Sequence, residues 1–119
     1  MTNPKGTKEE SRAVTWFREN GWPFARRLVK AGARDEGDIS LGDGYPVTIE
    51  SKAVKALDLA GWMKELEAEV ANGGNEWGFV IVKKRGTQDA GEYYCVLPLK
   101  YVNMLLHQLY VRRVIRRRR

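Results

Sequence analysis

The chain has 119 residues, of which 43% are hydrophobic and 30% charged, the size and composition of one folded domain. No apolar run approaches the roughly 18 residues that a membrane-spanning helix needs, and segment 1–10 lacks the hydrophobic stretch of a signal peptide. Cys95 is the only cysteine, which excludes an intramolecular disulfide and any metal site built from several thiolates. We therefore expect a cytoplasmic protein with no membrane partner and no organic small-molecule cofactor.

The net charge of +6 is concentrated at the C-terminus. Residues 111–119 contain six arginines and no acidic residue, and six is the whole excess of 21 lysines and arginines over 15 acidic residues. We predict a single domain over residues 1–111, followed by an arginine-rich tail over residues 112–119. Such a block of like charge is typical of an arm that contacts a polyanion, with nucleic acid favoured over a membrane surface. A solvated, disordered end is the alternative.

The N-terminal third is predicted to contain one helix and one extended segment. The helix is predicted to begin near Thr7, because Thr7 and Glu10 have the spacing of a capping box, and to end at Asn20-Gly21. Pro23–Leu28 is predicted to be extended. Residues 30–37, with two glycines and mixed charge, are predicted to form a loop.

A β-hairpin and a second helix are predicted next. Asp38–Leu41 and Val47–Ala53 are strand-like, and residues 42–46 between them are rich in turn-forming residues. Asp58 is a good N-cap for the helix that follows, and Asn72–Gly74 is a suitable stop.

The C-terminal part is predicted to add two strands and a final helix. Trp77–Lys83 is apolar enough to be a central strand, and Glu92–Leu97 follows a polar turn at residues 85–91. Pro98 suits the first turn of the final helix, whose many apolar positions suggest a homodimer face. Across a helical crossover, Trp77–Lys83 is expected to pair in parallel with Val47–Ala53 at the centre of the sheet. The fold class is therefore α/β or α+β, with a small mixed central sheet flanked by helices.

Charged residues on the predicted hairpin indicate metal-dependent chemistry. Alternation along a strand puts Glu50 and Lys52 on one face, where burial of either ion alone would cost several kcal/mol. A surface ion pair on an edge strand is the alternative. The hairpin brings Asp38 to the same end, so two carboxylates converge beside a lysine. Such hard oxygen ligands, with the backbone carbonyl of Ser51 as a further one, suit Mg²⁺, with Mn²⁺ as a substitute. Lys52 could then orient or help deprotonate an attacking water and stabilise negative charge in phosphodiester hydrolysis.

The order of these motifs resembles the PD-(D/E)xK nuclease superfamily. Five segments are similar to the Holliday-junction resolvases of archaea and their phage-encoded relatives: Lys5-Gly6-x-x-x-Glu10, Asn20-Gly21-Trp22, Arg26/Arg27, Gly37-Asp38-Ile39 and Glu50-Ser51-Lys52. The resemblance covers residues 5 to about 83. It implies a restriction-endonuclease-like core, a homodimer, and symmetric cutting of four-way DNA junctions with Mg²⁺. The active-site residues that it implies are Glu10, Asp38, Glu50 and Lys52.

Some positions depart from the family pattern or have a structural alternative. Gly37 stands in place of the proline of the superfamily name, and Ser51 replaces an apolar residue. Lys64 is the nearest candidate for the polar residue that many members carry in the following helix. Glu10 is a candidate metal ligand on the helix face that points toward the core, with Glu9 next to it as a fallback, although a capping role would also explain Glu10.

Basic residues are distributed so that several flank the predicted site. The candidates for contact with DNA phosphates are Lys5, Lys8, Arg26, Arg27, Lys55, Arg112, Arg113, Arg116 and Arg117. Because neighbouring residues of a strand face opposite ways, at most one of Arg26 and Arg27 is expected to approach the active face.

The expected function is therefore a homodimeric, Mg²⁺-dependent, structure-selective endodeoxyribonuclease, working in a host bacterial cytoplasm if it is phage-encoded. Phosphate contacts would supply affinity, and two sites at a fixed spacing would select the shape of a junction. A nickase, a flap nuclease or a restriction-like enzyme would use the same residues. A non-catalytic DNA-binding module is the alternative from another class, and it predicts metal-independent binding that is insensitive to Lys52→Ala.

Overall fold

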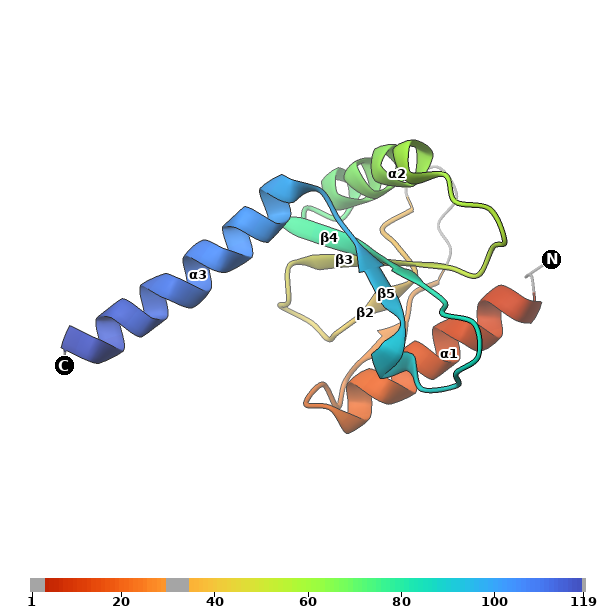
Figure 1. Cartoon of the computed structure of the whole chain (residues 1–119), viewed down its shortest axis with the longest axis horizontal. Coiled ribbons are helices and arrows are strands. Elements are labelled where there is room, and N and C mark those ends of the chain that lie inside the picture. The colour runs from red at the N-terminus through yellow and green to blue at the C-terminus, as the bar shows by residue number, and fades with distance from the viewer. Residues whose placement is uncertain (1–3, 30–34, 119) are drawn as a thin grey trace.

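The protein is a small mixed α+β domain with a five-stranded sheet and three α-helices (Figure 1). The computed structural model describes the backbone of residues 4–29 and 35–118, and the side chains of Lys8 and of residues 10–29 and 35–111. The elements in chain order are α1 (Pro4–Glu19), β1 (Arg26–Arg27), β2 (Ile39–Ser40), β3 (Val47–Lys52), α2 (Leu59–Asn72), β4 (Trp77–Val82), the 3₁₀ helix η2 (Ala90–Glu92), β5 (Tyr94–Val96) and α3 (Leu99–Arg118). Most of the predicted loop 30–37 lies outside the described residues.

The sheet has the strand order β1-β2-β3-β4-β5. β3 and β4 pair in parallel, with Val47 opposite Trp77 and Lys52 opposite Val82, and every other neighbouring pair is antiparallel. α2 is the crossover that parallel neighbours require. The predicted mixed sheet, with this parallel pair at its centre, is therefore confirmed.

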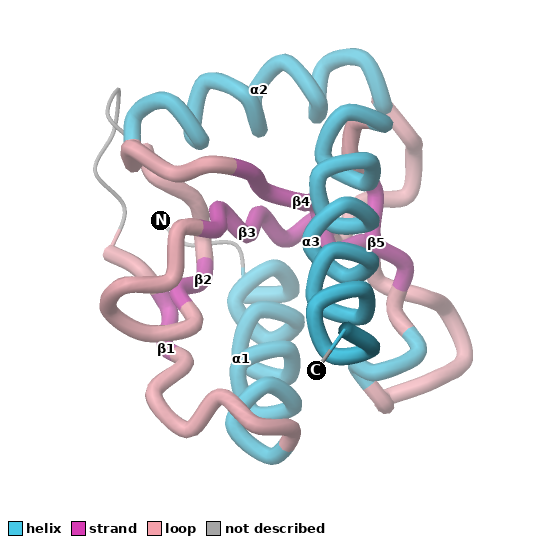
Figure 2. The backbone as a smooth tube through the Cα atoms, turned by 90° about the vertical axis from the view of Figure 1, so that its left-hand side faces the viewer, coloured by secondary structure: helices cyan, strands magenta, loops and turns pink. Residues whose placement is uncertain are grey.

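Two helices cover opposite faces of the sheet, α1 on one and α2 on the other (Figure 2). The buried core on the α1 side consists of Ala13, Val14, Ala25, Ile39, Leu41, Val47, Ile49, Ile81 and Tyr93. The buried core on the α2 side consists of Trp62, Leu66, Val70, Val80, Val82 and Tyr101. Because successive side chains of a strand point to opposite faces, β4 supplies apolar residues to both cores, whereas β3 supplies them only to the α1 side.

The start of α1 corrects one prediction. The helix begins at Pro4, so Thr7 lies inside it and is not its N-cap. Proline is well tolerated in the first turn of a helix, because its fixed φ suits the helix and its missing N–H has no partner there in any case. A capping box at Thr7 therefore does not explain Glu10.

The limits of α2 agree with the predicted ones. The Asp58 side chain accepts a hydrogen bond from Gly61 N at 3.1 Å and caps the helix, which ends at Asn72 before two glycines. The polar turn after β4 contains η2, and the strand predicted over 92–97 is shortened to Tyr94–Val96.

α3 projects from the body of the domain (Figure 1). The carbonyl of Pro98 accepts the amide of Tyr101 at 3.0 Å, as expected for a helix that begins directly after this proline. The helix runs to Arg118, so the backbone of the predicted tail continues α3. Leu109, Tyr110 and Val111 are exposed on it. No helix in the described part of the chain is both long and apolar enough to cross a membrane.

Candidate metal centre

The face of β3 that points toward α2 carries three of the four polar residues of the strand. Thr48 and Glu50 are buried there, and Lys52 is 19% exposed at the end of the strand. Thr48 Oγ1 accepts a hydrogen bond from Asn75 Nδ2 at 2.9 Å, which joins this face to the turn after α2. The alternation that the sequence predicted for these residues therefore directs Glu50 into the space between the sheet and α2.

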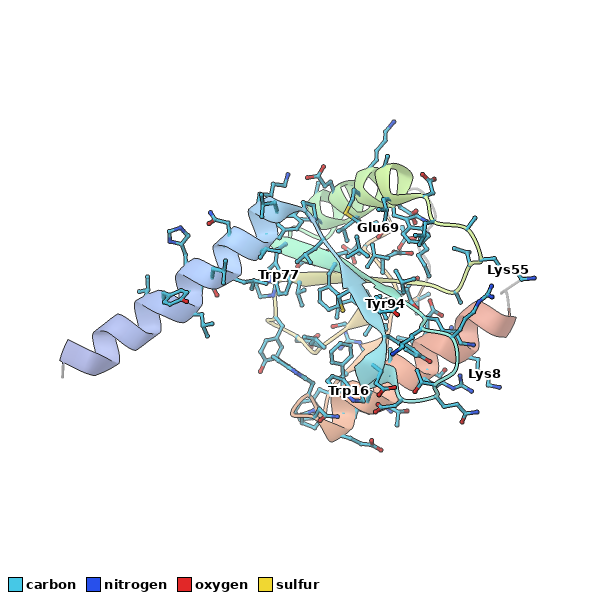
Figure 3. The ribbon with its side chains drawn as sticks, viewed as in Figure 1. Lys8, Trp16, Lys55, Glu69, Trp77 and Tyr94 are labelled. Atoms are coloured by element: carbon cyan, nitrogen blue, oxygen red, sulfur yellow. The ribbon has the colours of Figure 1, made fainter. Side chains whose placement is uncertain are left out.

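Three carboxylates converge in this space. Asp35, Glu50 and Glu69 each offer an oxygen atom, and these atoms lie within 4.8 Å of one another. Glu50 comes from β3, Glu69 lies between α2 and the sheet (Figure 3), and Asp35 precedes β2. We call these three residues the acidic cluster. Among the described residues, no other three acidic, histidine or cysteine side chains converge this closely.

The approach of Asp35 depends on the backbone at Gly37. Gly37 has a φ of +111°, a conformation that L-residues rarely adopt, and its amide donates to Asp35 Oδ1 at 2.9 Å. A Cβ atom at this position would lie 3.0 Å from the carbonyl oxygen of Ile49. Asn72 Nδ2 also donates to the carbonyl of Asp35, at 3.1 Å, and so ties this segment to the end of α2.

The acidic cluster contains buried carboxylate oxygens without a hydrogen-bond donor. Glu50 is 4% exposed and Glu69 is 3% exposed. Among the residues that the structure describes, neither Glu50 Oε2 nor Glu69 Oε2 accepts a hydrogen bond from an amide, hydroxyl or ammonium group, so a proton shared between the two carboxyls is the one hydrogen bond left to this pair. A buried polar atom that lacks a partner costs about 1–3 kcal/mol, and more if it is charged. Two such atoms facing a third carboxylate fit a bound cation.

Electrostatics in the cluster favour protonation in the absence of a cation. Burial, followed by the hydrogen bond and negative charge of Glu69, raises the pKa of Glu50 from 4.5 to about 9. The charge of Lys52 opposes this shift only in part. Burial also raises the pKa of Glu69, and the charges of Asp35 and Glu65 add to that shift. Three acids, Glu50, Glu65 and Glu69, therefore interact with the one ammonium group of Lys52, and Glu50 retains a proton that an isolated carboxylate would lose near neutral pH.

Lys52 is held at the edge of the acidic cluster. Its Nζ lies 3.1 Å and 3.3 Å from the two carboxylate oxygens of Glu65 on α2, and 4.0 Å from Glu50 Oε1. Glu65 is itself partly exposed, with 43% of its side-chain surface accessible. The ammonium group thus stands between the buried carboxylates and solvent, where it can meet an anionic substrate.

Asp38, the predicted metal ligand of the hairpin, contacts the strand beside Glu50. It is 2% exposed, and its Oδ2 accepts the amide of Ser51 at 2.8 Å. The amide and carbonyl of one strand residue point to the same side, so the Ser51 carbonyl also faces β2. Asp38 and Ser51 therefore adjoin the acidic cluster, but the set of three converging oxygens contains Asp35 in place of Asp38.

Glu10 is paired with an arginine on the α1 side of the sheet. It is buried, and its Oε2 lies 3.0 Å from Arg27 NH2. Arg26, the neighbour of Arg27, instead pairs with exposed Asp43 at 3.2 Å. The two arginines therefore diverge, as the alternation of a strand requires, and only Arg27 reaches a predicted site residue.

Of the remaining residues predicted to contact DNA, the structure describes the side chains of two. Lys8 and Lys55 are both exposed and lie toward the same end of the domain (Figure 3). The side chains of Lys5, of the fallback Glu9, and of Arg112, Arg113, Arg116 and Arg117 lie outside the described residues. Lys64, the candidate for the polar residue in the helix after β3, is exposed on α2.

Three residues of the site have no counterpart in the sequence interpretation: Asp35, Glu65 and Glu69. Glu69 carried a usable signal, because it shares the helix face of Trp62 and Leu66 and is therefore an acid at a core-facing position. Asp35 carried none, since its position depends on the turn at Gly37.

Comparisons of the chain with protein-family models, with curated proteins and with solved structures find no match. Three converging carboxylates form a set of hard oxygen ligands, which could hold a metal ion.

Proposed function

We propose that the protein is a Mg²⁺-dependent endodeoxyribonuclease acting on branched DNA. The observation that carries this proposal is the acidic cluster of Asp35, Glu50 and Glu69 beside Lys52, with two buried carboxylate oxygens that lack a donor. Carboxylates and a lysine at the end of a strand are the groups that metal-assisted phosphodiester hydrolysis requires. A purely structural role would not explain Glu50 and Glu69, because burial of carboxylates that lack a cationic partner lowers stability.

The ligand set favours Mg²⁺, with Mn²⁺ as a substitute, over softer metals. All three converging groups are carboxylates, and the described residues offer no histidine or cysteine in the cluster. When bound, the ion would neutralise part of the phosphate charge and polarise the scissile bond. Asp38 Oδ2 and the Ser51 carbonyl adjoin the cluster and are candidates for contacts to water around the ion.

Besides the charge of the metal ion, the proposed site has a positive charge of its own, the ammonium group of Lys52. Its ammonium group would bind a non-bridging phosphate oxygen and orient the attacking water, because it is held from one side by Glu65 and remains partly accessible. Glu50 and Glu69, which retain protons more readily than ordinary carboxylates, would release them as the cation binds. Glu65 acts through Lys52 and is a positioning residue.

The choice of branched DNA rests on the resemblance of the sequence to Holliday-junction resolvases. That resemblance also supports a restriction-endonuclease-like core and a homodimer, for which exposed apolar residues of α3 offer a contact face. Two sites at a fixed spacing would select a junction by its shape. A nickase, a flap nuclease or a restriction-like enzyme would use the same cluster on another substrate.

The test is cleavage of a labelled synthetic four-way junction, with and without Mg²⁺ or Mn²⁺, beside a linear duplex of the same sequence. Wild type, Glu50→Gln, Lys52→Ala and the control Lys100→Ala, an exposed lysine at the start of α3, are compared. We expect paired, symmetric nicks in the junction alone, reduced roughly 100- to 1000-fold by the first two substitutions and unchanged by the third.

Other outcomes separate the alternatives. Equal cleavage of every substrate would retain the nuclease and reject the junction as its specific substrate. Tight, metal-independent DNA binding without cleavage, unaffected by Lys52→Ala, would reject the nuclease in favour of a DNA-binding module. In that case, deletion of residues 112–119 should remove most of the affinity and lower the salt dependence by about 0.9 per lost phosphate contact.

A further inference from the structure

A basic groove runs between α1 and the segment that follows β4. It has a volume of about 590 Å³ and is open to solvent. The residues that line it are Lys8, Arg12, Lys83, Arg85, Gly86, Thr87 and Gln88. Two of its four basic residues come from α1 and two from the chain after β4, so the groove exists only because these elements, distant in sequence, lie side by side (Figures 1 and 2).

The charge of the basic groove is of one sign. Its lining includes four cationic side chains, and no described carboxylate lines it. A second hollow of about 520 Å³ shares Lys8, Arg12 and Gln88 and continues along α1 past Trp16. This hollow includes Glu19 and Asp89, so its lining becomes acidic away from the basic groove. An anion would therefore be attracted to one end of the combined depression and repelled from the other.

The basic groove begins at the end of the sheet where Lys52 lies. The amide of Lys83 donates to the carbonyl of Lys52 at 3.2 Å, directly after the last paired residues of β3 and β4. Because β3 and β4 are parallel, their carboxyl ends lie at the same edge of the sheet. Open α/β sheets bind ligands at the carboxyl ends of their parallel strands. The groove and the acidic cluster thus approach the same end of β3 from opposite faces of the sheet.

We propose that the basic groove binds the sugar–phosphate backbone of a DNA strand and leads that strand to Lys52. The proposal rests on the proposed nuclease function and deepens it, because it assigns Arg12, Lys83 and Arg85 as phosphate-binding residues. Lys8 and Arg12 are one helical turn apart, about 6 Å, and can contact successive phosphates. Gly86, Thr87 and Gln88 add backbone and side-chain groups for hydrogen bonds to phosphate and sugar oxygens.

A DNA backbone fits the basic groove better than a membrane surface does. The groove is concave and its lining residues are polar or charged, whereas peripheral membrane binding uses apolar side chains that enter the lipid beside the basic ones. A strand of phosphodiesters can enter such a groove and contact basic residues on both of its walls.

The test measures binding of a labelled single strand and of a labelled four-way junction to the full chain in EDTA, over a series of salt concentrations. Lys8→Glu and Arg85→Glu each reverse one charge, on opposite walls of the basic groove. Both side chains are exposed, so the fold should persist, which circular dichroism verifies. Lys100→Glu is the matched control, since it makes the same charge change at an exposed position at the start of α3.

We expect Lys8→Glu and Arg85→Glu each to weaken binding roughly fivefold and to lower the salt slope on single strands by about 0.7, while Lys100→Glu changes neither. Equal weakening by all three substitutions would mean a general charge effect and would overturn the proposal. Unchanged DNA binding, with loss of binding to vesicles rich in phosphatidylserine, would overturn it in favour of a membrane surface.

Failure of the nuclease and failure of the basic groove are distinguishable. If the two groove substitutions weaken binding as expected but no metal supports cleavage, the phosphate-binding groove stands and the nuclease does not. If both variants bind and cut the junction like wild type, the nuclease stands and the basic groove is rejected.

Discussion

The two faces of β3 assign different tasks to alternate residues of one strand. Val47 and Ile49 point toward α1 and are buried in an apolar core. Thr48, Glu50 and Lys52 point toward α2 and carry hydrogen bonds, ion pairs and two of the groups proposed for chemistry. The apolar core on one face and the proposed chemistry on the other are thus separated by a periodicity of two residues, without a loop or a second domain.

The α2 side can accommodate this polarity because β4 compensates for it. Val80 and Val82 point to the same face and pack against Trp62 and Leu66, so α2 is held by the strand next to β3. Burial of such apolar side chains contributes roughly 1.5–3 kcal/mol each, which offsets the cost of desolvating carboxylates nearby. The stabilising residues and the destabilising ones are neighbours in the sheet.

The largest change in stability is expected from a substitution on the apolar face of β3. Ile49 has no accessible surface, and Ile49→Ala should lower the free energy of unfolding by about 3–4 kcal/mol, through lost burial and the cavity left behind. Val54→Ala, an exposed position just after β3, should cost less than about 0.5 kcal/mol. Urea unfolding of both variants measures the difference. Similar values for the two would mean that the α1 side does not carry the stability of the sheet.

The second effect concerns the polar face of β3 and the cation that we propose for the acidic cluster. Mn²⁺ or Mg²⁺ at about 100 times its dissociation constant should raise the free energy of unfolding by roughly 2.7 kcal/mol, because the ligands converge only in the native state. Glu69→Gln should abolish most of this gain. Glu67→Gln, on the solvent side of the same helix, should retain it. Denaturant unfolding with and without the ion tests this, and retention of the full gain by Glu69→Gln would remove that residue from the metal site.

The strong local signals explain why most of the fold is predictable. β4 is a continuous apolar run, and α2 has both a capping aspartate and a terminal pair of glycines, so their limits agree with the sequence patterns. The start of α1 was misplaced because Thr7 and Glu10 imitate a capping box, whereas Pro4 already suits the first turn. Competing local signals of similar strength are not resolved by spacing alone.

Of the acidic cluster and its neighbouring lysine, only Glu50 and Lys52, which belong to the same strand, are predictable from the sequence. Glu50 and Lys52 lie two residues apart, so their shared face follows from strand geometry. Asp35 and Glu69 join them through the docking of α2 and through the left-handed turn at Gly37, which are tertiary features. The i, i+4, i+7 spacing of Trp62, Leu66 and Glu69 shows in retrospect that the helix buries an acid, but not which groups it meets.

The third effect is the dependence of stability on pH in EDTA. The pKa of Glu50 is raised from 4.5 to about 9, so the native state holds a proton that the unfolded chain releases. The stabilisation is complete below the unfolded pKa and is lost as pH rises toward the native one. Between about pH 5 and about pH 7, the free energy of unfolding should fall by roughly 1 kcal/mol per pH unit.

Substitutions test whether this dependence of the free energy of unfolding on pH arises from Glu50. Glu50→Gln should flatten it, while Glu76→Gln, an exposed acid before β4, should leave it unchanged. Urea unfolding of the three proteins at each pH is the measurement. A slope of equal size in Glu50→Gln would assign the pH dependence to other groups. It would also contradict the retention of a proton by Glu50 in the native state.

The smallest effect is expected at Glu65, where a role in positioning Lys52 can be distinguished from a role in stabilising the fold. Glu65 meets Lys52 through both carboxylate oxygens but is partly exposed, so Glu65→Gln should change the free energy of unfolding by less than about 1 kcal/mol. If Glu65 positions the ammonium group for the phosphate, kcat for junction cleavage should fall roughly three- to tenfold with KM unchanged, and Glu65→Asp should recover part of the loss. Glu67→Gln again serves as the control on the same helix. A structural role alone would lower stability and leave kcat intact, whereas an unchanged kcat with unchanged stability would show that Lys52 needs no partner on α2.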